Sequence, residues 1–290
     1  MPGQSAANLD LPVSTAVLAR VGRREVFLWV VTCLFANQAL QLVDTGSLKA
    51  FAASLAVQNY IYWLACYAVI YRLYNSDGTV RATRFDCCLA LAIGLSIFLS
   101  SFLPYRFATG LLATLTAGYF LTAQGGDRNL KAAGAVLLAL SAHLVWGPII
   151  FQFFTPELLR ADAALVGEIL TSLRPDIIWR GTNFQTPDGH SIVLVGGCSS
   201  FNNVSTAVLG CATIAMMTRT QWIRRDITTV AIASVVMILA NAARLCLIAW
   251  SSSAHLFWHN GVGEQILAIS QTVIILLVAW WGAAPSRRPA

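Results

Sequence analysis

The 290-residue chain is too apolar to be an ordinary water-soluble protein. Hydrophobic residues make up 57% of it, charged residues only 11%, and its mean hydropathy is +0.66. The net charge of +6 does not indicate a nucleic-acid partner, because the basic residues lie in short clusters between apolar runs and form no basic stripe. We therefore expect an integral membrane protein whose partners include membrane lipids and no nucleic acid.

Apolar runs long enough to cross a bilayer, which takes roughly 20 residues of helix, recur along the whole chain. In order, they cover residues 26–43, 51–71, 87–104, 107–123, 132–154, 198–218, 227–250 and 265–281. A segment inside hydrocarbon must pair its own backbone N–H and C=O groups, and a helix does so. The sequence thus predicts an all-α integral membrane protein of about eight transmembrane helices.

The distribution of Lys and Arg predicts the orientation. When the N-terminus is placed in the cytoplasm, every short cytoplasmic loop is basic, which agrees with the cytoplasmic excess of Lys and Arg in membrane proteins. Residues 1–25 then form a cytoplasmic N-terminal segment. Residues 26–290 form one polytopic membrane domain whose C-terminus is also cytoplasmic, with residues 155–197 as its extracytoplasmic insertion.

The insertion is predicted to contain a surface helix and a β-hairpin. Residues 156–173 carry Leu and Ile at helical spacing, which indicates a helix lying on the membrane. Residues 177–179 are apolar and precede the turn sequence Pro187-Asp188-Gly189, after which residues 191–195 are mostly β-branched and apolar. This order is typical of a hairpin between the fifth and sixth helices.

Seven cysteines with no CxxC spacing indicate neither a disulfide framework nor a zinc site, and we expect no metal and no cofactor. Cys198 differs from the others because it follows Gly196-Gly197 and is predicted to open the sixth helix at the outer interface. The positive end of a helix favours a nucleophilic thiolate. Position alone leaves equally open the interpretation of Cys198 as a small apolar residue.

Arg244 lies inside the seventh predicted helix, near its outer end. Burying a guanidinium in a membrane costs at least ~2.5 kcal/mol, so an intramembrane Arg indicates a functional role. The alternative is that its long side chain reaches back to the interface. Asn241 is three residues earlier on the same helical face and is predicted to orient Arg244.

His259 falls in the short outer connection between the last two helices, with His255 as a competitor for the same role. Taken alone, anchoring at the interface is the stronger interpretation of such a histidine. The predicted topology, however, brings His259 to the same outer face as Cys198 and Arg244. A thiol can attack a carbonyl, an imidazole can move the proton, and a fixed cation can stabilise the oxyanion, so the three residues form a coherent set for acyl transfer.

Other polar residues in the predicted helices are weaker signals. Asn202 and Ser205 continue the helical face of Cys198, where they either pack helices together or line a substrate groove. His143, in the fifth helix, is interpreted as a hydrogen-bonded core residue rather than a ligand.

In these residues the C-terminal half resembles the exosortase/archaeosortase family of membrane-embedded cysteine transpeptidases. The resemblance rests on the order of Cys198-Ser199, Asn241-x-x-Arg244 and His259-x-x-x-Gly263 after a predicted hairpin. The first five helices resemble the family only in hydropathy. The chain also departs from the family pattern: Gly197 and Ser200 flank the Cys-Ser pair where the family has Ala and Gly, and Asn202 stands where many members have Arg.

The resemblance implies a multi-pass protein of the bacterial inner membrane with its active site on the extracytoplasmic side. Its substrates are then exported proteins of the PEP-CTERM type, which end in a short motif, a transmembrane helix and a basic tail. Cys198 is implied as the nucleophile, with Arg244 and His259 as its catalytic partners. We expect four further residues to bind substrate or support the site: Ser199, Asn202, Asn241 and His255. The cleaved protein is held as a thioester and passes to an acceptor or to water, and in this family the activity often accompanies exopolysaccharide production.

A second hypothesis comes from a different class of protein. A non-catalytic transporter or polysaccharide-handling protein also places a cation inside the membrane, and Arg244 would then bind an anionic substrate. Such transporters often contain inverted repeats and broken helices at paired positions, which the sequence does not display.

Overall fold

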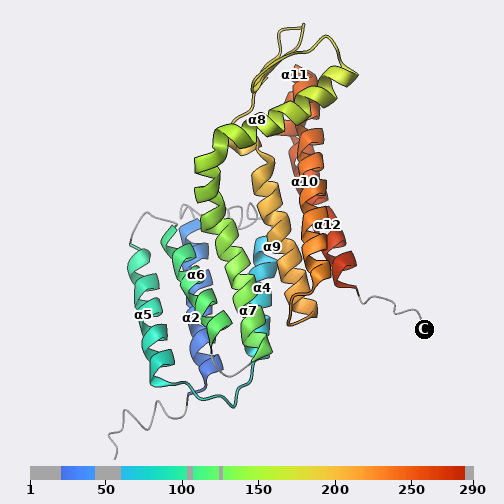
Figure 1. The fold of residues 1–290 in the computed structure, drawn as a ribbon. Coiled ribbons are helices and arrows are strands. Elements are labelled where there is room, and N and C mark those ends of the chain that lie inside the picture. Colours follow the sequence, from blue (N-terminus) through green and yellow to red (C-terminus); the bar gives the residue numbers. More distant parts are fainter. Residues whose placement is uncertain (1–20, 43–59, 103–106, 124–126, 285–290) are drawn as a thin grey trace, which may run out of the picture.

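The computed structural model describes residues 21–42, 60–102, 107–123 and 127–284, and shows a mostly helical bundle with a small sheet at one end (Figure 1). Its α-helices are α2 (Arg23–Leu42), α4 (Tyr60–Tyr74), α5 (Arg84–Ser100), α6 (Phe107–Thr122), α7 (Arg128–Ser141), α8 (Gly147–Leu173), α9 (Ser200–Thr218), α10 (Arg224–Trp250), α11 (Ser252–Asn260) and α12 (Val262–Ala283). A π-helical segment, η1 (Ala142–Trp146), joins α7 to α8.

The predicted helical class is confirmed for the described residues, and the predicted hairpin has one additional strand. A helix covers most of the described part of every predicted apolar run, whereas the start of the second run lies outside the described residues. Within that part of the chain, three stretches are long and apolar enough to cross a membrane: Arg128–Leu173, Arg224–Trp250 and Val262–Ala283. The number of crossings, eight, and their orientation stay predictions.

Large apolar side chains on the outside of the bundle agree with a lipid environment. Trp29 on α2, Leu91 on α5 and Phe153 on α8 are each more than 70% exposed. Exposed apolar area on this scale is unusual for a water-soluble monomer. The chain is therefore a multi-pass membrane protein.

Glycines allow α12 to approach its neighbours closely. A Cβ on Gly210 of α9 would lie 2.5 Å from Cγ2 of Ile275 on α12, and one on Gly282 of α12 would collide with Oγ1 of Thr229 on α10. Small residues at helix contacts are typical of membrane bundles, where close packing replaces the hydrophobic driving force. The last three long helices, α9, α10 and α12, therefore form one packed unit.

Arg72, at the end of α4, binds the C-terminal end of α9. Its Nε donates to the carbonyl oxygen of Met216 at 2.6 Å, and its Nη2 donates to that of Met217 at 2.8 Å. A third bond runs from Nη1 to Oδ1 of Asn129 on α7 at 2.9 Å. The last carbonyls of a helix lack partners within it and carry partial negative charge, so a guanidinium stabilises this end. Arg72 thus joins three helices in addition to marking the predicted cytoplasmic side.

The predicted surface helix over residues 156–173 is not a separate element. It is the outer part of α8, which continues through Pro156 and bends in that region (Figure 1). Proline lacks the N–H that would close the helical turn, and its ring clashes with the preceding turn, so a bend is expected there. Contact of this outer part with a membrane surface stays a prediction.

The predicted hairpin is part of a three-stranded antiparallel sheet. Its strands are β1 (Ile178–Arg180), β2 (Asn183–Gln185) and β3 (Ser191–Val193), in the spatial order β1-β2-β3. The predicted turn at Pro187–Gly189 lies between β2 and β3. The sequence interpretation missed a second turn at Gly181, whose φ of +60° suits glycine, and this turn pairs β1 with β2 instead of β3.

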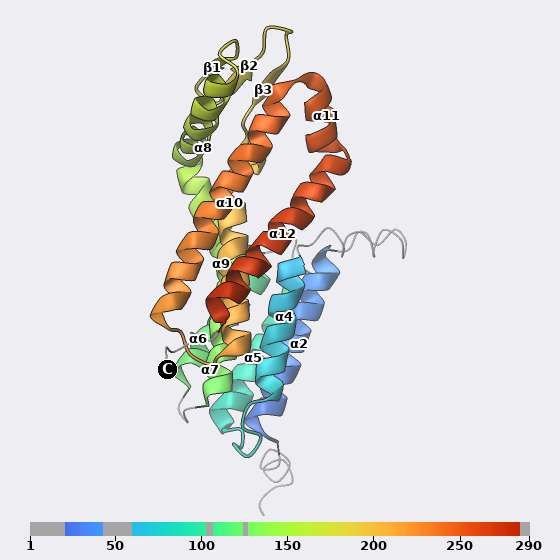
Figure 2. The same ribbon diagram turned by 90° about the vertical axis from the view of Figure 1, so that its right-hand side faces the viewer.

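The sheet packs on α8 and α10 through a separate apolar core, which we call the outer cluster. It contains Ala163, Val166, Leu170, Ile177, Phe184, Ile192, Leu194, Ala242, Leu245, Cys246, Ile248 and Ala249. Figure 2 shows the sheet, the outer part of α8 and α11 together at the same end of the bundle, beyond α2 and α4. The outer cluster therefore fixes the sheet over the ends of α8 and α10.

Replacing Arg72 is expected to loosen the attachment of α9. Arg72→Met removes three charge-assisted hydrogen bonds and leaves two carbonyls at the end of α9 without this donor, which should lower stability by about 2–4 kcal/mol. Thermal unfolding of the purified protein in detergent measures the effect. The matched change Arg81→Met, at an exposed position, should leave the unfolding temperature nearly unchanged; equal unfolding of both variants would contradict the role of Arg72.

Candidate functional site

Cys198 lies in a tight turn just before α9. It ends the 3₁₀ segment η2 (Gly196–Cys198), where its N–H donates to the carbonyl oxygen of Val195 at 2.7 Å. Ser199 is the N-cap of α9, with an extended backbone and a hydroxyl that accepts a hydrogen bond from the N–H of Phe201 at 3.2 Å. Because Ser199 caps the helix, α9 begins at Ser200, and Cys198 precedes the helix instead of opening it as predicted.

The carboxylate of Asp162, on α8, holds this turn. Its Oδ2 accepts from Ser199 Oγ and from the N–H of Ser200, both at 2.9 Å, and its Oδ1 accepts from Ser200 Oγ at 2.6 Å. Asp162 is only 8% exposed. A carboxylate beside the first N–H groups of a helix is stabilised by the helix dipole and by charge-assisted bonds. Ser199 and Ser200 therefore have a structural role next to Cys198.

Sequence reasoning missed Asp162, although a signal was present. The buried positions of the outer part of α8 include Leu159, Ala163, Val166 and Leu170, which follow a helical apolar pattern. Asp162 occupies the same buried face. A charged residue at an apolar position of a helix indicates a specific partner, but it does not say which one.

Asn241, on α10, holds the turn from the opposite side. Its Nδ2 donates to the carbonyl oxygen of Cys198 at 2.9 Å, and its Oδ1 accepts from Nδ2 of Asn203 at 3.1 Å. The side chain is 1% exposed, so both bonds are shielded. Asn241 was predicted to orient Arg244, whereas its amide binds the backbone of Cys198 and the side chain of Asn203. Asn241 thus supports the backbone of Cys198 and not the side chain of Arg244.

The side chain of Cys198 faces protein. It is partly buried and packs against the outer cluster, as does Trp258 of α11. The cluster itself combines residues of α8, of α10 and of the sheet with its flanking segments. Cys198 and the α11 segment that carries His259 therefore border the same apolar core.

Arg244 lies on α10 one turn beyond Asn241, about 4.5 Å further along the helix axis. It is half-buried, and within the described part of the chain it has no hydrogen bond or ion pair. Its guanidinium carries five N–H donors in a planar fork. The donors are therefore available to a bound carbonyl or carboxylate.

His259 belongs to a cluster of three imidazoles that includes His255 and His190. The expected loop between the last two helices contains α11, which places His255 and His259 one turn apart, with ring centroids 5.0 Å from each other. His190, at the end of the β2–β3 turn, lies 5.4 Å from His255 and has its Nε2 3.3 Å from the carbonyl oxygen of Ile248. His190 was not among the predicted site residues, because its neighbours are distant in sequence.

The surroundings of His255 favour its neutral form. Burial lowers the pKa of His255 from its ordinary value, and the charges of His259 and His190 lower it further. Nδ1 of both His255 and His259 is buried and has no hydrogen-bond partner among the described residues. A neutral imidazole can accept a proton. Within the described residues, no group of three or more His, Cys, Asp or Glu side chains is arranged to hold a metal ion.

Residues of α10 contact or carry several parts of the candidate site. Asn241 binds Cys198, Arg244 follows after one turn, and Ile248, about 10 Å from Asn241 along the axis, binds His190. Among the described residues, however, no hydrogen bond or ion pair joins the side chains of Cys198, Arg244 and His259 to one another. Catalytic hydrogen bonds are often long in a free enzyme and tighten when substrate binds.

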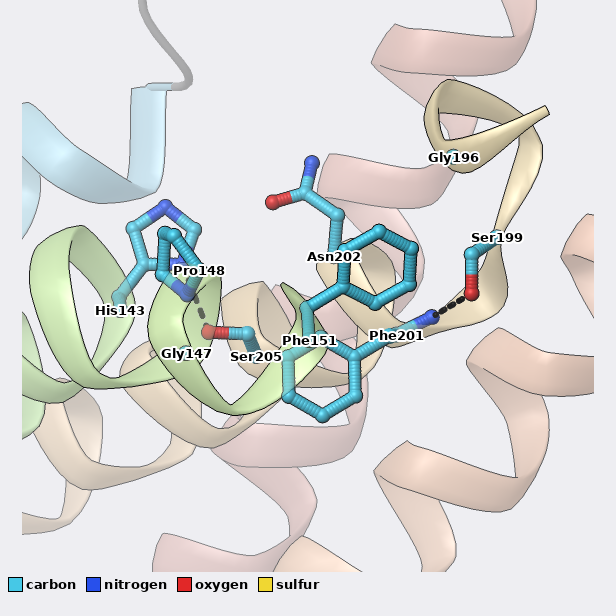
Figure 3. Close-up of a pocket in the computed structure, with 9 residues that line it drawn as sticks. All are labelled: His143, Gly147, Pro148, Phe151, Gly196, Ser199, Phe201, Asn202 and Ser205. Carbon is cyan, nitrogen blue, oxygen red and sulfur yellow. Dashed lines mark hydrogen bonds between the residues drawn. The ribbon is translucent and has the colours of Figure 1, made fainter. Parts of the chain in front are cut away.

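A cavity of about 140 Å³ opens on the α8 side of α9 (Figure 3). It is lined by His143, Gly147, Pro148, Phe151, Gly196, Ser199, Phe201, Asn202 and Ser205. The interpretation of His143 as a hydrogen-bonded residue is confirmed, because its Nδ1 lies 2.9 Å from Ser205 Oγ. Asn202, a predicted substrate-binding or supporting residue, lies at this cavity and not on the Arg244 side.

Comparison with known proteins gives one match. The family model described as transmembrane exosortase matches residues 56–277, which is well over half of the chain and includes Cys198, Arg244 and His259. No curated protein and no solved structure matches. The chain therefore belongs to the transmembrane exosortase family.

Proposed function

We propose that the protein is a membrane-embedded cysteine peptidase and transpeptidase that cleaves C-terminal sorting signals of exported proteins on the extracytoplasmic side of the inner membrane. Family membership supports this class of reaction and substrates of the PEP-CTERM type. The observation that carries the proposal is the fixed backbone of Cys198, held by Asp162 through the next two residues and by Asn241 directly. Arg244 lies one helical turn from Asn241.

In the proposed reaction, Cys198 is the nucleophile. His259 takes the proton from its thiol, the sulfur forms a bond to the scissile carbonyl carbon, and the carbonyl electrons move to the oxygen. Arg244 stabilises this oxyanion through its unused N–H donors. When the C–N bond breaks, His259 gives the proton to the leaving amine, and the exported protein remains bound to Cys198 as a thioester.

The second half of the reaction releases the product. An acceptor amine, an acceptor hydroxyl or water attacks the thioester carbonyl and gives its proton to His259. The C–S bond then breaks, and the sulfur of Cys198 recovers a proton from His259. A cysteine that stays in the same position through both steps needs a rigid backbone, which is what Asp162 and Asn241 supply.

Replacing Cys198 by alanine should abolish processing, since no other group would form the thioester. The measurement is the shift in size of a co-expressed exported protein from the same genome that ends in a transmembrane helix and a basic tail. Cys88→Ala, which changes an exposed cysteine on α5, is the matched control and should process normally. Normal processing by the Cys198→Ala variant would show that the proposed mechanism is wrong.

Arg244→Met should reduce the processing rate by about 10²–10³-fold, the usual effect of losing one oxyanion-stabilising donor. Pulse-chase labelling of the same exported protein gives the rate. Arg224→Met removes an exposed cation from the first turn of the same helix and should leave the rate unchanged. A rate close to that of the parent in Arg244→Met would argue against the oxyanion role.

Asp162→Asn should lower both processing and stability, because the neutral amide cannot accept all three hydrogen bonds with its oxygen alone. The expected loss of stability is about 1–3 kcal/mol. Asp176→Asn changes a surface carboxylate paired with Arg174 and should leave the unfolding temperature nearly unchanged. Thermal unfolding in detergent measures the stability of both variants, and the processing rate measures their activity. Equal losses in Asp162→Asn and Asp176→Asn would contradict the role of Asp162.

A further inference from the structure

Among the described residues that line the cavity beside Cys198 there is no Asp, Glu, Lys or Arg. Its walls combine apolar groups, among them the stacked rings of Phe151 and Phe201 with centroids 5.6 Å apart, with the amide of Asn202 and the hydrogen-bonded pair His143 and Ser205. A volume of about 140 Å³ is close to that of an engineered cavity that binds benzene. The cavity therefore has room for one medium-sized side chain.

The cavity begins at the turn that carries Cys198. Gly196 and Ser199, which flank this cysteine in sequence, both line it. The cavity is therefore adjacent to the turn at which the substrate is bound in the proposed reaction. A Cβ on Gly196 would lie 3.3 Å from Cε1 of Phe151, so a side chain at this position would crowd the lining of the cavity.

The two sides of α9 differ in chemistry. The cavity lies between α9 and the η1–α8 segment, whereas Arg244 and the histidines belong to α10, α11 and the sheet turn (Figures 1 and 3). In the proposed reaction the leaving amine must meet His259, because that imidazole returns its proton. The leaving segment then lies on the α10 side, and the acyl residue lies on the other side of Cys198.

Resting on the proposed function, we infer that the cavity lined by Phe151, Phe201 and Asn202 binds the substrate residue that donates the scissile carbonyl, and that it selects an uncharged side chain of up to about the size of a benzene ring. A charged side chain would lose its hydration there without gaining a counter-ion. The amide of Asn202 is exposed and makes no hydrogen bond with the described residues through its side chain (Figure 3). It offers a donor and an acceptor to the backbone of the bound residue.

The test is a set of substrates that differ at one position. The cleavage site of a co-expressed exported protein is mapped by mass spectrometry of the parent's product. The residue that donates the carbonyl is then changed to Ala, Leu, Phe, Asp and Lys. The parent should process the best uncharged substrate at least about tenfold faster than the Asp and Lys substrates, since a single poorly matched group in an apolar pocket costs about tenfold or more.

Phe151→Ala enlarges the cavity and should raise the rate for Phe relative to Ala at the tested position by about tenfold. Phe153→Ala, on the same helix but 77% exposed, is the matched control and should keep the parent's ratio. Asn202→Leu should slow all uncharged substrates by a similar factor, because its contact is with the backbone. Immunoblots check that each variant accumulates in the membrane, and Phe151→Leu replaces Phe151→Ala in the comparison if the latter does not.

The outcomes separate this inference from the proposed function. Suppose that Cys198→Ala abolishes processing. If Phe151→Ala and Phe151→Leu then keep the parent's ratio, or if the parent processes the Asp and Lys substrates as fast as the uncharged ones, the assignment of the cavity is wrong. The cysteine mechanism stands in either case. If Cys198→Ala processes normally, the proposed function fails, and the inference fails with it.

Discussion

The buried carboxylate of Asp162 is the constraint on which the outer end of the molecule depends. A carboxylate that is only 8% exposed must be hydrogen-bonded, and its three bonds come from Ser199 and Ser200. These bonds attach α8 to the start of α9. Since α8 also forms one side of the core beneath the sheet, the sheet, the cysteine turn and α9 cannot shift independently. The position of Cys198 is therefore set by a charge that takes no part in the proposed chemistry.

Both ends of α9 are matched to its dipole by residues from other helices. Asp162 places negative charge at the N-terminal end, and Arg72 places positive charge at the C-terminal end through the carbonyls of Met216 and Met217. Arg72 belongs to α4, which the sequence linked to the family only by its hydropathy but which lies within the residues that the family model matches. The N-terminal helices thus contribute to the site by holding the far end of the helix that follows Cys198.

The helices were largely predictable because the length and apolarity of a run are local properties of the sequence, and a helix pairs its own backbone. The features that were missed depend on distant partners. Asp162 bonds Ser200, 38 positions away, and His190 meets the carbonyl of Ile248, 58 positions away. The third strand required the turn at Gly181, a single glycine with positive φ. The helix α11 was missed although a local signal for it was present. His255 and His259 are four residues apart, which is a helical spacing, but the segment was interpreted as a loop.

The structure shows what two of the residues that depart from the family pattern, Ser200 and Asn202, contact. Ser200 stands where the family has glycine. A glycine would keep the N–H bond to Asp162, but only serine adds the hydroxyl bond, so this departure strengthens the turn. Asn202 stands where many members have arginine, and the described residues that line its cavity include no Asp, Glu, Lys or Arg. An arginine at this position would place a cation beside Phe151 and Phe201 and would favour an anionic or strongly polar group. A neutral amide leaves the apolar walls and the peptide backbone as the features to be recognised, so the cavity of this chain and that of an arginine-bearing member should differ in the side chains they accept.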